Sequence, residues 1–229
     1  MRHILILAFV LLLALFASGA AAAVAIEDGE PIALKLHMAG EPPPDCNDES
    51  SYEWVPKDSI GVTYNEATKG LDKVISKVSR MIGPCGDPGF YGHSDDGQVS
   101  LAMWGNDKTI KTMRLTIPFC VDPYRLSLGS YSDVESATKW LISCLDGAFP
   151  SYDRSENSEW VNRFIKSLMN KPLRNPMLQN KIEAADGCVL FQKQEPFVRS
   201  LTKEAEAILK CDLFGHKFTL EITPPRKKR

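Results

Sequence analysis

The stretch "QVSLAMWGNDKTIKTMRLTI" (Gln98–Ile117) decides the fold class, because it contains two strand-like segments joined by a short turn. The segments "QVSLAMW" and "IKTMRLTI" both alternate in places between apolar and polar residues, which is the period of a half-buried strand. The connector "GNDKT" contains Gly105 and Asn106, which favour a tight reversal of the chain. The stretch therefore predicts an antiparallel hairpin with strands at 98–104 and 110–117.

Four segments around this hairpin carry apolar residues at helical spacing. They predict helices over 66–81, 132–147, 159–169 and 196–210. At the start of the second helix, Ser132 and Glu135 form the pair expected of a capping box. Two further strands are predicted, over 188–192 and 216–222.

This order of elements predicts an α+β fold, with helices packed on one face of a small, mostly antiparallel, disulfide-stabilised sheet. No glycine-rich turn from strand to helix occurs, which argues against a doubly wound sheet. We expect a signal peptide at 1–22, an extended lead-in or pro-segment at 23–51, a single domain at 52–222 and a basic tail at 223–229.

The amino-terminal residues have the pattern of a secretory signal peptide. A short basic start precedes the unbroken apolar run Ile4–Phe16, and small residues follow over Ala17–Ala25. The apolar run is shorter than the roughly 20 residues that cross a bilayer. We therefore expect cleavage between Ala20 and Ala25, a secreted, extracellular protein, and no transmembrane segment.

The cysteines agree with export to an oxidising compartment, because they are even in number and all follow the leader. Up to three disulfides are expected, from about 15 possible pairings. No C-x-x-C pair or Cys/His pair at zinc spacing occurs, so no metal and no cofactor are predicted. The predicted disulfide cysteines are Cys46, Cys85, Cys120, Cys144, Cys188 and Cys211.

The charge of the chain is nearly balanced, with a formal net charge of −2. No overall field attracts nucleic acid, which is therefore not an expected partner. The exception is the tail "TPPRKKR" (Thr223–Arg229), whose four cations suit weak contact with anionic surfaces. A processing site for proteases and a solvated terminus are the alternative interpretations of this tail.

The glycine-rich stretch "GPCGDPGFYGHSDDG" (Gly83–Gly97) raises the question of a hydrolase site, a metal loop or a turn. A catalytic triad needs side chains that converge from separate positions, whereas His93, Ser94 and Asp95 are neighbours and diverge. The alternating aspartate spacing of a calcium loop is absent. Glycine and aspartate are common turn residues, so the stretch predicts a loop.

Aromatic residues in or beside predicted loops are the candidate binding residues, because exposed aromatic side chains often dominate protein contacts. The alternative is that each covers part of a small core. The candidates are Trp54, Phe90, Tyr91 and Tyr124.

The segment "GSYSDVESATKWLISC" (Gly129–Cys144) resembles small secreted cysteine-rich proteins of fungi, of the killer-toxin-like and effector class. The resemblance covers one helix and the overall layout. It implies a secreted toxin or a host-directed effector, and it carries over no functional residue.

Three functions follow from these patterns. The leading hypothesis is a secreted protein that binds a protein or a cell-surface target outside the cell. The second is a secreted hydrolase that uses His93 or His216 with an acidic partner. The third is a carrier of a small apolar ligand held between helices and sheet. We assign no catalytic residue from the sequence.

Overall fold

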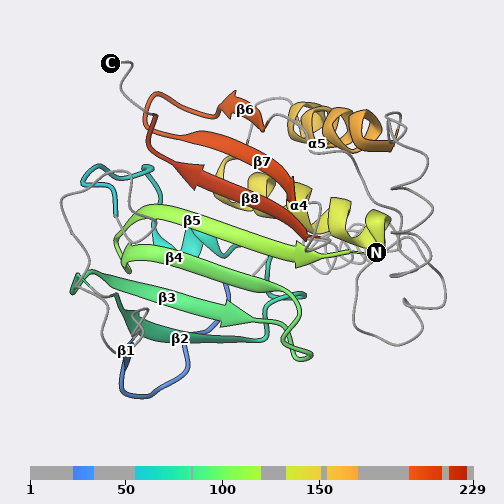
Figure 1. The fold of residues 1–229 in the computed structure, drawn as a ribbon. Coiled ribbons are helices and arrows are strands. Elements are labelled where there is room, and N and C mark those ends of the chain that lie inside the picture. The colour runs from blue at the N-terminus through green and yellow to red at the C-terminus, as the bar shows by residue number, and fades with distance from the viewer. Residues whose placement is uncertain are drawn as a thin grey trace, which may run out of the picture.

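An eight-stranded sheet forms the body of the protein (Figure 1). The structure is a computed structural model, which describes residues 23–33, 55–83, 85–119, 133–150, 154–169, 196–212 and 217–225. The described elements are β1 (Ile32–Ala33), α2 (Tyr64–Ala67), β2 (Lys77–Ile82), β3 (Pro88–His93), β4 (Ser100–Asn106), β5 (Thr109–Pro118), α4 (Val134–Ala148), α5 (Arg154–Met169), β6 (Phe197–Ser200), β7 (Glu206–Asp212) and β8 (Lys217–Thr223).

The strand order is β1-β2-β3-β4-β5-β8-β7-β6. Neighbouring strands are antiparallel except for β1 and β2, which are parallel. The strand β8 returns from the end of the chain to pair with β5, from Met113 opposite Ile222 to Pro118 opposite Lys217. The two halves of the chain therefore build one sheet and share one hydrophobic core.

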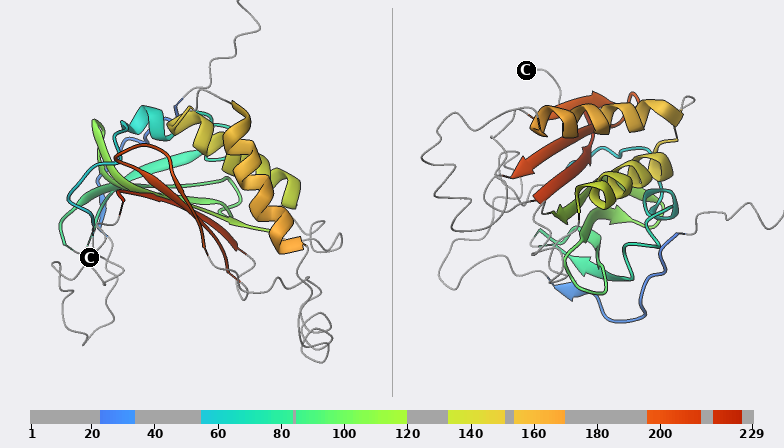
Figure 2. Two further views of the ribbon diagram at one scale, coloured as in Figure 1. Left: turned by 90° about the horizontal axis from the view of Figure 1, so that it is seen from above. Right: turned by 90° about the vertical axis from the view of Figure 1, so that its right-hand side faces the viewer.

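The helices α4 and α5 lie together on one face of the bent sheet (Figure 2). Asp133 caps α4 by accepting a hydrogen bond from a backbone N–H of the first turn. In α5, the ring of Phe164 makes edge contacts with Phe197 and Phe218, at centroid separations of 5.2 and 6.1 Å. Phe218 also stacks on Phe119 at 3.8 Å. These apolar contacts hold α5 against the carboxy-terminal strands.

The predicted fold class is wrong. The sheet has eight strands rather than a few and is mixed, because β1 and β2 are parallel, and only the helices α2, α4 and α5 are described beside it. No disulfide joins two of the described residues, although Cys85 is disulfide-bonded, so disulfides are not seen to link the described elements to one another. What holds this part together is the buried apolar face of a long sheet.

The predicted helix over 66–81 is wrong, because this segment is divided between the one-turn helix α2 and the strand β2. Gly70 has a positive φ of 81°, a backbone conformation that side chains rarely tolerate and that ends the helical path. From Lys77 onward the chain pairs with β3, beginning with Lys77 opposite His93. The apolar residues of this segment, which recur at helical spacing in the sequence, therefore lie in a turn and then in a strand.

The predicted helix over 196–210 is also wrong, because it is the hairpin of β6 and β7. The segment has good helix formers, but Ala207, Ile208 and Leu209 are all buried in a row. A continuous buried run is typical of a strand that is covered on both faces. β7 lies between β6 and β8, so tertiary packing overrides local propensity here.

The predicted loop over 83–97 is wrong in its middle, where Pro88–His93 forms the strand β3. Gly89 and Gly92 serve packing in this strand. A Cβ at Gly89 would lie 2.5 Å from the carbonyl oxygen of Met103 and 2.7 Å from the ring of Trp104. The glycines that indicate a turn in the sequence are therefore required by the close approach of β4 and of side chains.

The hairpin predicted from Gln98–Ile117 is confirmed as β4 and β5, whose register runs from Ser100 opposite Thr116 to Asn106 opposite Thr109. The predicted helices over 132–147 and 159–169 correspond to α4 and α5, and the strand at 216–222 corresponds to β8. The strand predicted over 188–192 lies outside the described residues.

Candidate functional site

The candidate aromatic residues do not form one surface in the described structure. Trp54 and Tyr124 lie outside the described residues. Phe90 is 1% exposed and packs on Tyr64 at a centroid distance of 4.6 Å, so its expected place at a binding surface is corrected to the core. Tyr91 is 39% exposed, with its ring 6.3 Å from that of His93.

Two histidines are proposed for hydrolysis: His93 lies at the end of β3, and His216 lies outside the described residues. The Nδ1 atom of His93 is 2.8 Å from the carbonyl oxygen of Ser94, which accepts a hydrogen bond and so places the proton on Nδ1. The Ser94 hydroxyl donates to Asp96, and this bond holds the pKa of the Asp96 carboxyl below its usual value. These groups build the turn between β3 and β4.

The described cysteines differ in whether they form a disulfide. Cys144 is a buried free thiol, so the disulfide expected at this position is not present. Burial raises the pKa of the Cys144 thiol to about 12, which makes it unreactive at neutral pH. Cys85 is disulfide-bonded. Cys46, Cys120 and Cys188 lie outside the described residues.

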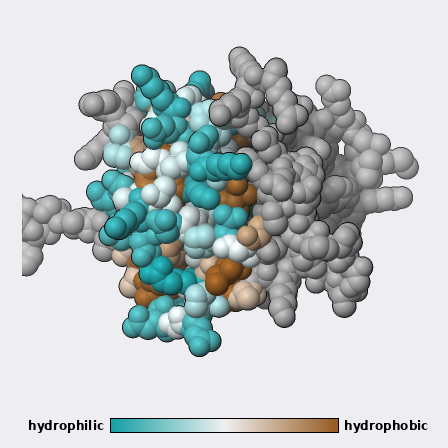
Figure 3. Space-filling model, turned by 90° about the vertical axis from the view of Figure 1, so that its left-hand side faces the viewer, coloured by the Kyte–Doolittle hydropathy of each residue, from teal (hydrophilic) through white to brown (hydrophobic). Residues whose placement is uncertain are grey.

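Exposed apolar side chains are scattered over the described surface. On the side that lies to the left in Figure 1, hydrophilic atoms predominate and hydrophobic areas are small and separate (Figure 3). The exposed large hydrophobic residues lie on β1, β2, β3 and β6, and they are Ile32, Ile82, Tyr91 and Val198. These residues do not point to one broad docking surface in the described part of the chain.

A groove of about 710 Å³ lies where four parts of the chain meet, and we call it the Arg199 groove. This volume is within the range of roughly 300–1,000 Å³ that is usual for ligand sites. The lining comes from the segment before α2, α2 itself, the junction of α4 and α5, and β6 with the turn that follows it. The lining residues are Ile60, Gly61, Val62, Glu66, Ala148, Phe149, Pro150, Glu156, Asn157, Arg199, Leu201, Thr202, Lys203 and Glu204.

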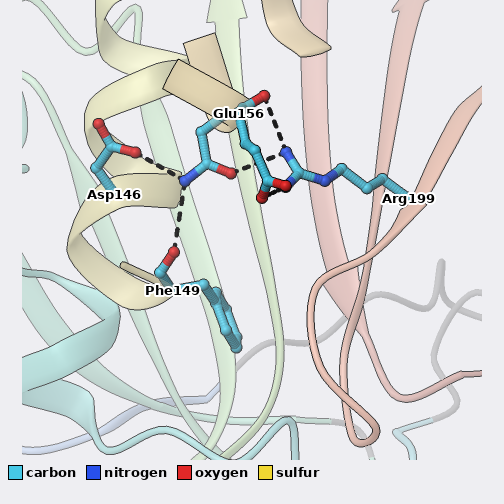
Figure 4. A network of polar contacts seen from close by, with 5 residues as sticks. Asp146, Phe149, Glu156 and Arg199 are labelled. Carbon is cyan, nitrogen blue, oxygen red and sulfur yellow. Dashed lines mark hydrogen bonds and ion pairs between the residues drawn. The ribbon is translucent and has the colours of Figure 1, made fainter. Parts of the chain in front are cut away.

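One wall of the groove is fixed by a polar network around Asn157, which is 1% exposed (Figure 4). Its amide nitrogen donates to Asp146 Oδ1 at 2.7 Å and to the carbonyl oxygen of Phe149 at 3.4 Å. Its amide oxygen accepts a hydrogen bond of 3.0 Å from Arg199, which also pairs with Glu156 at 2.8 Å. The network ties the α4–α5 junction to β6, because a buried polar side chain is stable only when its hydrogen bonds are made.

The rest of the rim is charged, and two of its carboxylates lie near the segment before α2. Glu66 accepts hydrogen bonds from the backbone N–H and the hydroxyl of Thr63, each at 2.8 Å, and these hold its pKa below the usual range. A Cβ at Gly61 would lie 2.6 Å from the carboxylate of Glu204, so this carboxylate packs where a side chain at position 61 would otherwise lie. Among the described residues, none donates a hydrogen bond to the Glu204 carboxylate.

The groove combines charged and apolar side chains. Three carboxylates and two cations line it, which leaves one negative charge in excess. Its buried apolar residues include Ile60, Val62 and Phe149. No histidine, cysteine or serine is among the described residues that line the groove.

Sequence reasoning missed this groove for an identifiable reason. Asn157 and Arg199 are 42 positions apart in the chain, and no local pattern connects them. One signal was present: "TYNE" (Thr63–Glu66) has the spacing of a capping box, which the structure forms at the start of α2. That signal would have placed Glu66 at a helix start, but it would not have found the groove.

No protein-family model, curated protein or solved structure matches this chain. Within the described residues, no helix is long and apolar enough to cross a membrane. In the same residues, no three His, Cys, Asp or Glu side chains are grouped so that they could hold a metal ion. The function is therefore inferred from the groove itself.

Proposed function

We propose that the protein is exported and acts by binding a partner polypeptide outside the cell through the Arg199 groove. The leader sequence Ile4–Phe16 with its small-residue flank supports export. The resemblance of Gly129–Cys144 to secreted fungal toxins and effectors supports a host-directed role as the specific form of this binding. The groove supports recognition, because it combines an apolar floor with a charged rim.

The observation that carries the proposal is the fixed geometry of one groove wall. Binding that must first order a side chain loses affinity, whereas a wall that is already ordered does not. Arg199 has only 20% of its side chain exposed and makes hydrogen bonds to Glu156 and Asn157 on the facing helix. The wall is thus held in place before a partner arrives.

The charges of the groove favour a particular partner. The carboxylate of Glu204 and the anionic Glu66 line the groove together with the buried Ile60 and Val62. A partner that presents an apolar side chain next to a lysine or an arginine would fill the floor and pair with these carboxylates. We therefore propose a polypeptide with a basic residue beside an apolar one.

A phage-displayed library of short random peptides, selected on the immobilised protein, tests this proposal. The selected peptides are expected to share an apolar residue beside a lysine or an arginine. Glu204→Gln should weaken their binding by about two- to fivefold, which is the size of an exposed ion pair. The matched control is Glu159→Gln, an exposed carboxylate of α5 outside the groove. Selection without a consensus, or equal affinities of the two variants, would contradict the proposal.

A further inference from the structure

The two edges of the sheet differ in how the chain covers them. At one edge, Ile26 forms a parallel bridge with Val78, and the backbone N–H of Glu27 donates to the carbonyl oxygen of Val78 at 2.7 Å. The strand β1 then continues this cover of β2. At the other edge β6 is the outermost strand (Figure 1), and in the described part of the chain no strand pairs with its outer side. Within the described structure, the edge at β6 is thus the one that can accept a further strand.

The hydrogen bonds to β7 show which backbone groups of β6 face outward. The backbone N–H of Leu201 donates to the carbonyl oxygen of Ala205 at 2.9 Å, next to the pair of Ser200 and Glu206. Hydrogen-bonded and non-hydrogen-bonded pairs alternate along an antiparallel ladder. Ser200 and Val198 are therefore in the non-hydrogen-bonded pairs, and their N–H and C=O groups point away from β7. Each of the two residues offers one donor and one acceptor to a partner strand.

The side chains of β6 suit a strand that pairs further. Arg199 reaches Glu156 and Asn157 of α5, so Val198 points to the face of the sheet away from that helix. Val198 is 58% exposed and β-branched, which favours an extended partner beside it. The strand "FVRS" contains no proline and no lysine, the residues with which many native edges repel a further strand.

The strand β6 leads directly into the Arg199 groove. Arg199 lines the groove, and so does the turn that follows β6, which carries Glu204. A partner strand that lies beside β6 and continues past Ser200 therefore runs toward the Glu204 carboxylate. Backbone bonds to the edge would fix the register of the partner and so bring its basic side chain to the rim. In strand addition, backbone bonds supply affinity and side-chain sites supply specificity.

We propose that the partner polypeptide binds as an added strand along the outer edge of β6, with its backbone paired to Val198 and Ser200 and its basic residue at the Glu204 end. This inference rests on the proposed function and adds the conformation in which the partner is bound. That conformation is extended, because the backbone groups of a helix are already paired within the helix and have nothing to offer the edge.

Single N-methylation of a peptide selected from the library tests the inference. A methyl group on one backbone nitrogen removes a donor and blocks the approach of a neighbouring strand, but it leaves every side chain unchanged. In an added strand, alternate N–H groups face β6. Methylation at alternate positions of the paired stretch should weaken binding by at least about tenfold, and methylation at the intervening positions by no more than about twofold. Effects that do not alternate would overturn the inference.

A pair of protein variants tests the same contact from the other side. Val198→Pro removes an N–H that faces outward and keeps the bonds between β6 and β7, since proline is tolerated at such edge positions. It should weaken binding of the unmethylated peptide by at least about fivefold. The matched control is Val198→Thr, which keeps the N–H and the β-branched shape and should change binding by no more than about twofold. Equal affinities of the two folded variants would overturn the inference, and if Val198→Pro does not fold, the methylated peptides decide alone.

The outcomes separate this inference from the proposed function. Peptides whose binding depends on Glu204 but shows no alternation overturn the added strand and leave the groove proposal standing. A selection without a consensus peptide overturns both. Size-exclusion chromatography without peptide is expected to show a monomer. A dimer that Val198→Pro converts to a monomer would assign the edge to a second copy of the chain and overturn the partner strand.

Discussion

Replacement of Asn157 by alanine is the most informative change to the groove wall. The substitution removes the hydrogen bonds to Asp146 at 2.7 Å, to the carbonyl oxygen of Phe149 at 3.4 Å and from Arg199 at 3.0 Å. Two of these bonds involve a charged partner, and such bonds contribute about 1.5–3 kcal/mol each. Arg199 keeps its bonds to Glu156, which recovers part of this loss. We expect the free energy of unfolding to fall by about 2–4 kcal/mol.

The control for this prediction lies on the same helix. Asn162→Ala removes one exposed hydrogen bond of 3.1 Å to Ser158 and should change stability by no more than about 0.5 kcal/mol. Both substitutions make a similar gain in helix propensity, which cancels in their difference. In a domain of this size, about 1 kcal/mol corresponds to roughly 2–4 °C. Melting curves should therefore separate Asn157→Ala from Asn162→Ala by about 5–15 °C, and equal curves would refute the structural role of the network.

Three further predictions concern other parts of the fold. Burial raises the pKa of Cys144 to about 12, so iodoacetamide should leave this thiol unmodified in the native protein at about pH 8 and modify it in denaturant. Peptide mapping that finds Cys144 modified in the native state would contradict its burial. Urea unfolding should show that Gly147→Ala destabilises the protein by about 1–3 kcal/mol, because the alanine Cβ would overlap a backbone carbonyl oxygen of the turn after α2, although alanine is the better helix former. A stabilised variant would show that this contact is not so close. Burial by itself raises the pKa of Glu221, but the hydrogen bond from Lys210 and the charge of Arg114 outweigh burial and lower the pKa. The pairing therefore stabilises the fold above the usual carboxyl pKa, and this stabilisation is lost as the pH falls through the lowered pKa. The stability difference between wild type and Glu221→Gln should accordingly shrink between about pH 6 and about pH 3, and a constant difference would argue against this pairing.

The parts of the fold that the sequence predicts are those whose contacts are local. The hairpin β4–β5 has its turn residues and both strands within one continuous stretch, and α4 is a continuous amphipathic run, although its cap is Asp133 and not the predicted Ser132. Both are visible without knowledge of the rest of the chain. The same holds for the turn at Ser94–Gly97, where side chains bond to backbone groups a few residues away.

The parts that the sequence does not predict depend on distant partners. The strand β2 exists because it pairs with β3, and β7 because it lies between β6 and β8, whereas their own spacing of apolar residues fits a helix equally well. Gly89 looks like a turn residue until the ring of Trp104 is placed against it. The groove escapes prediction for the same reason, because Asn157 and Arg199 meet only when α5 packs beside β6.

The central claim is that the Arg199 groove is the surface that binds a partner. Hydrogen-exchange mass spectrometry of the protein, with and without a peptide selected from the library, tests this claim most directly. The groove account predicts slower exchange at 60–66 and at 199–204, with little change elsewhere in the described residues. Slower exchange confined to β3 around Tyr91 would contradict it, and would place recognition on the opposite face of the sheet.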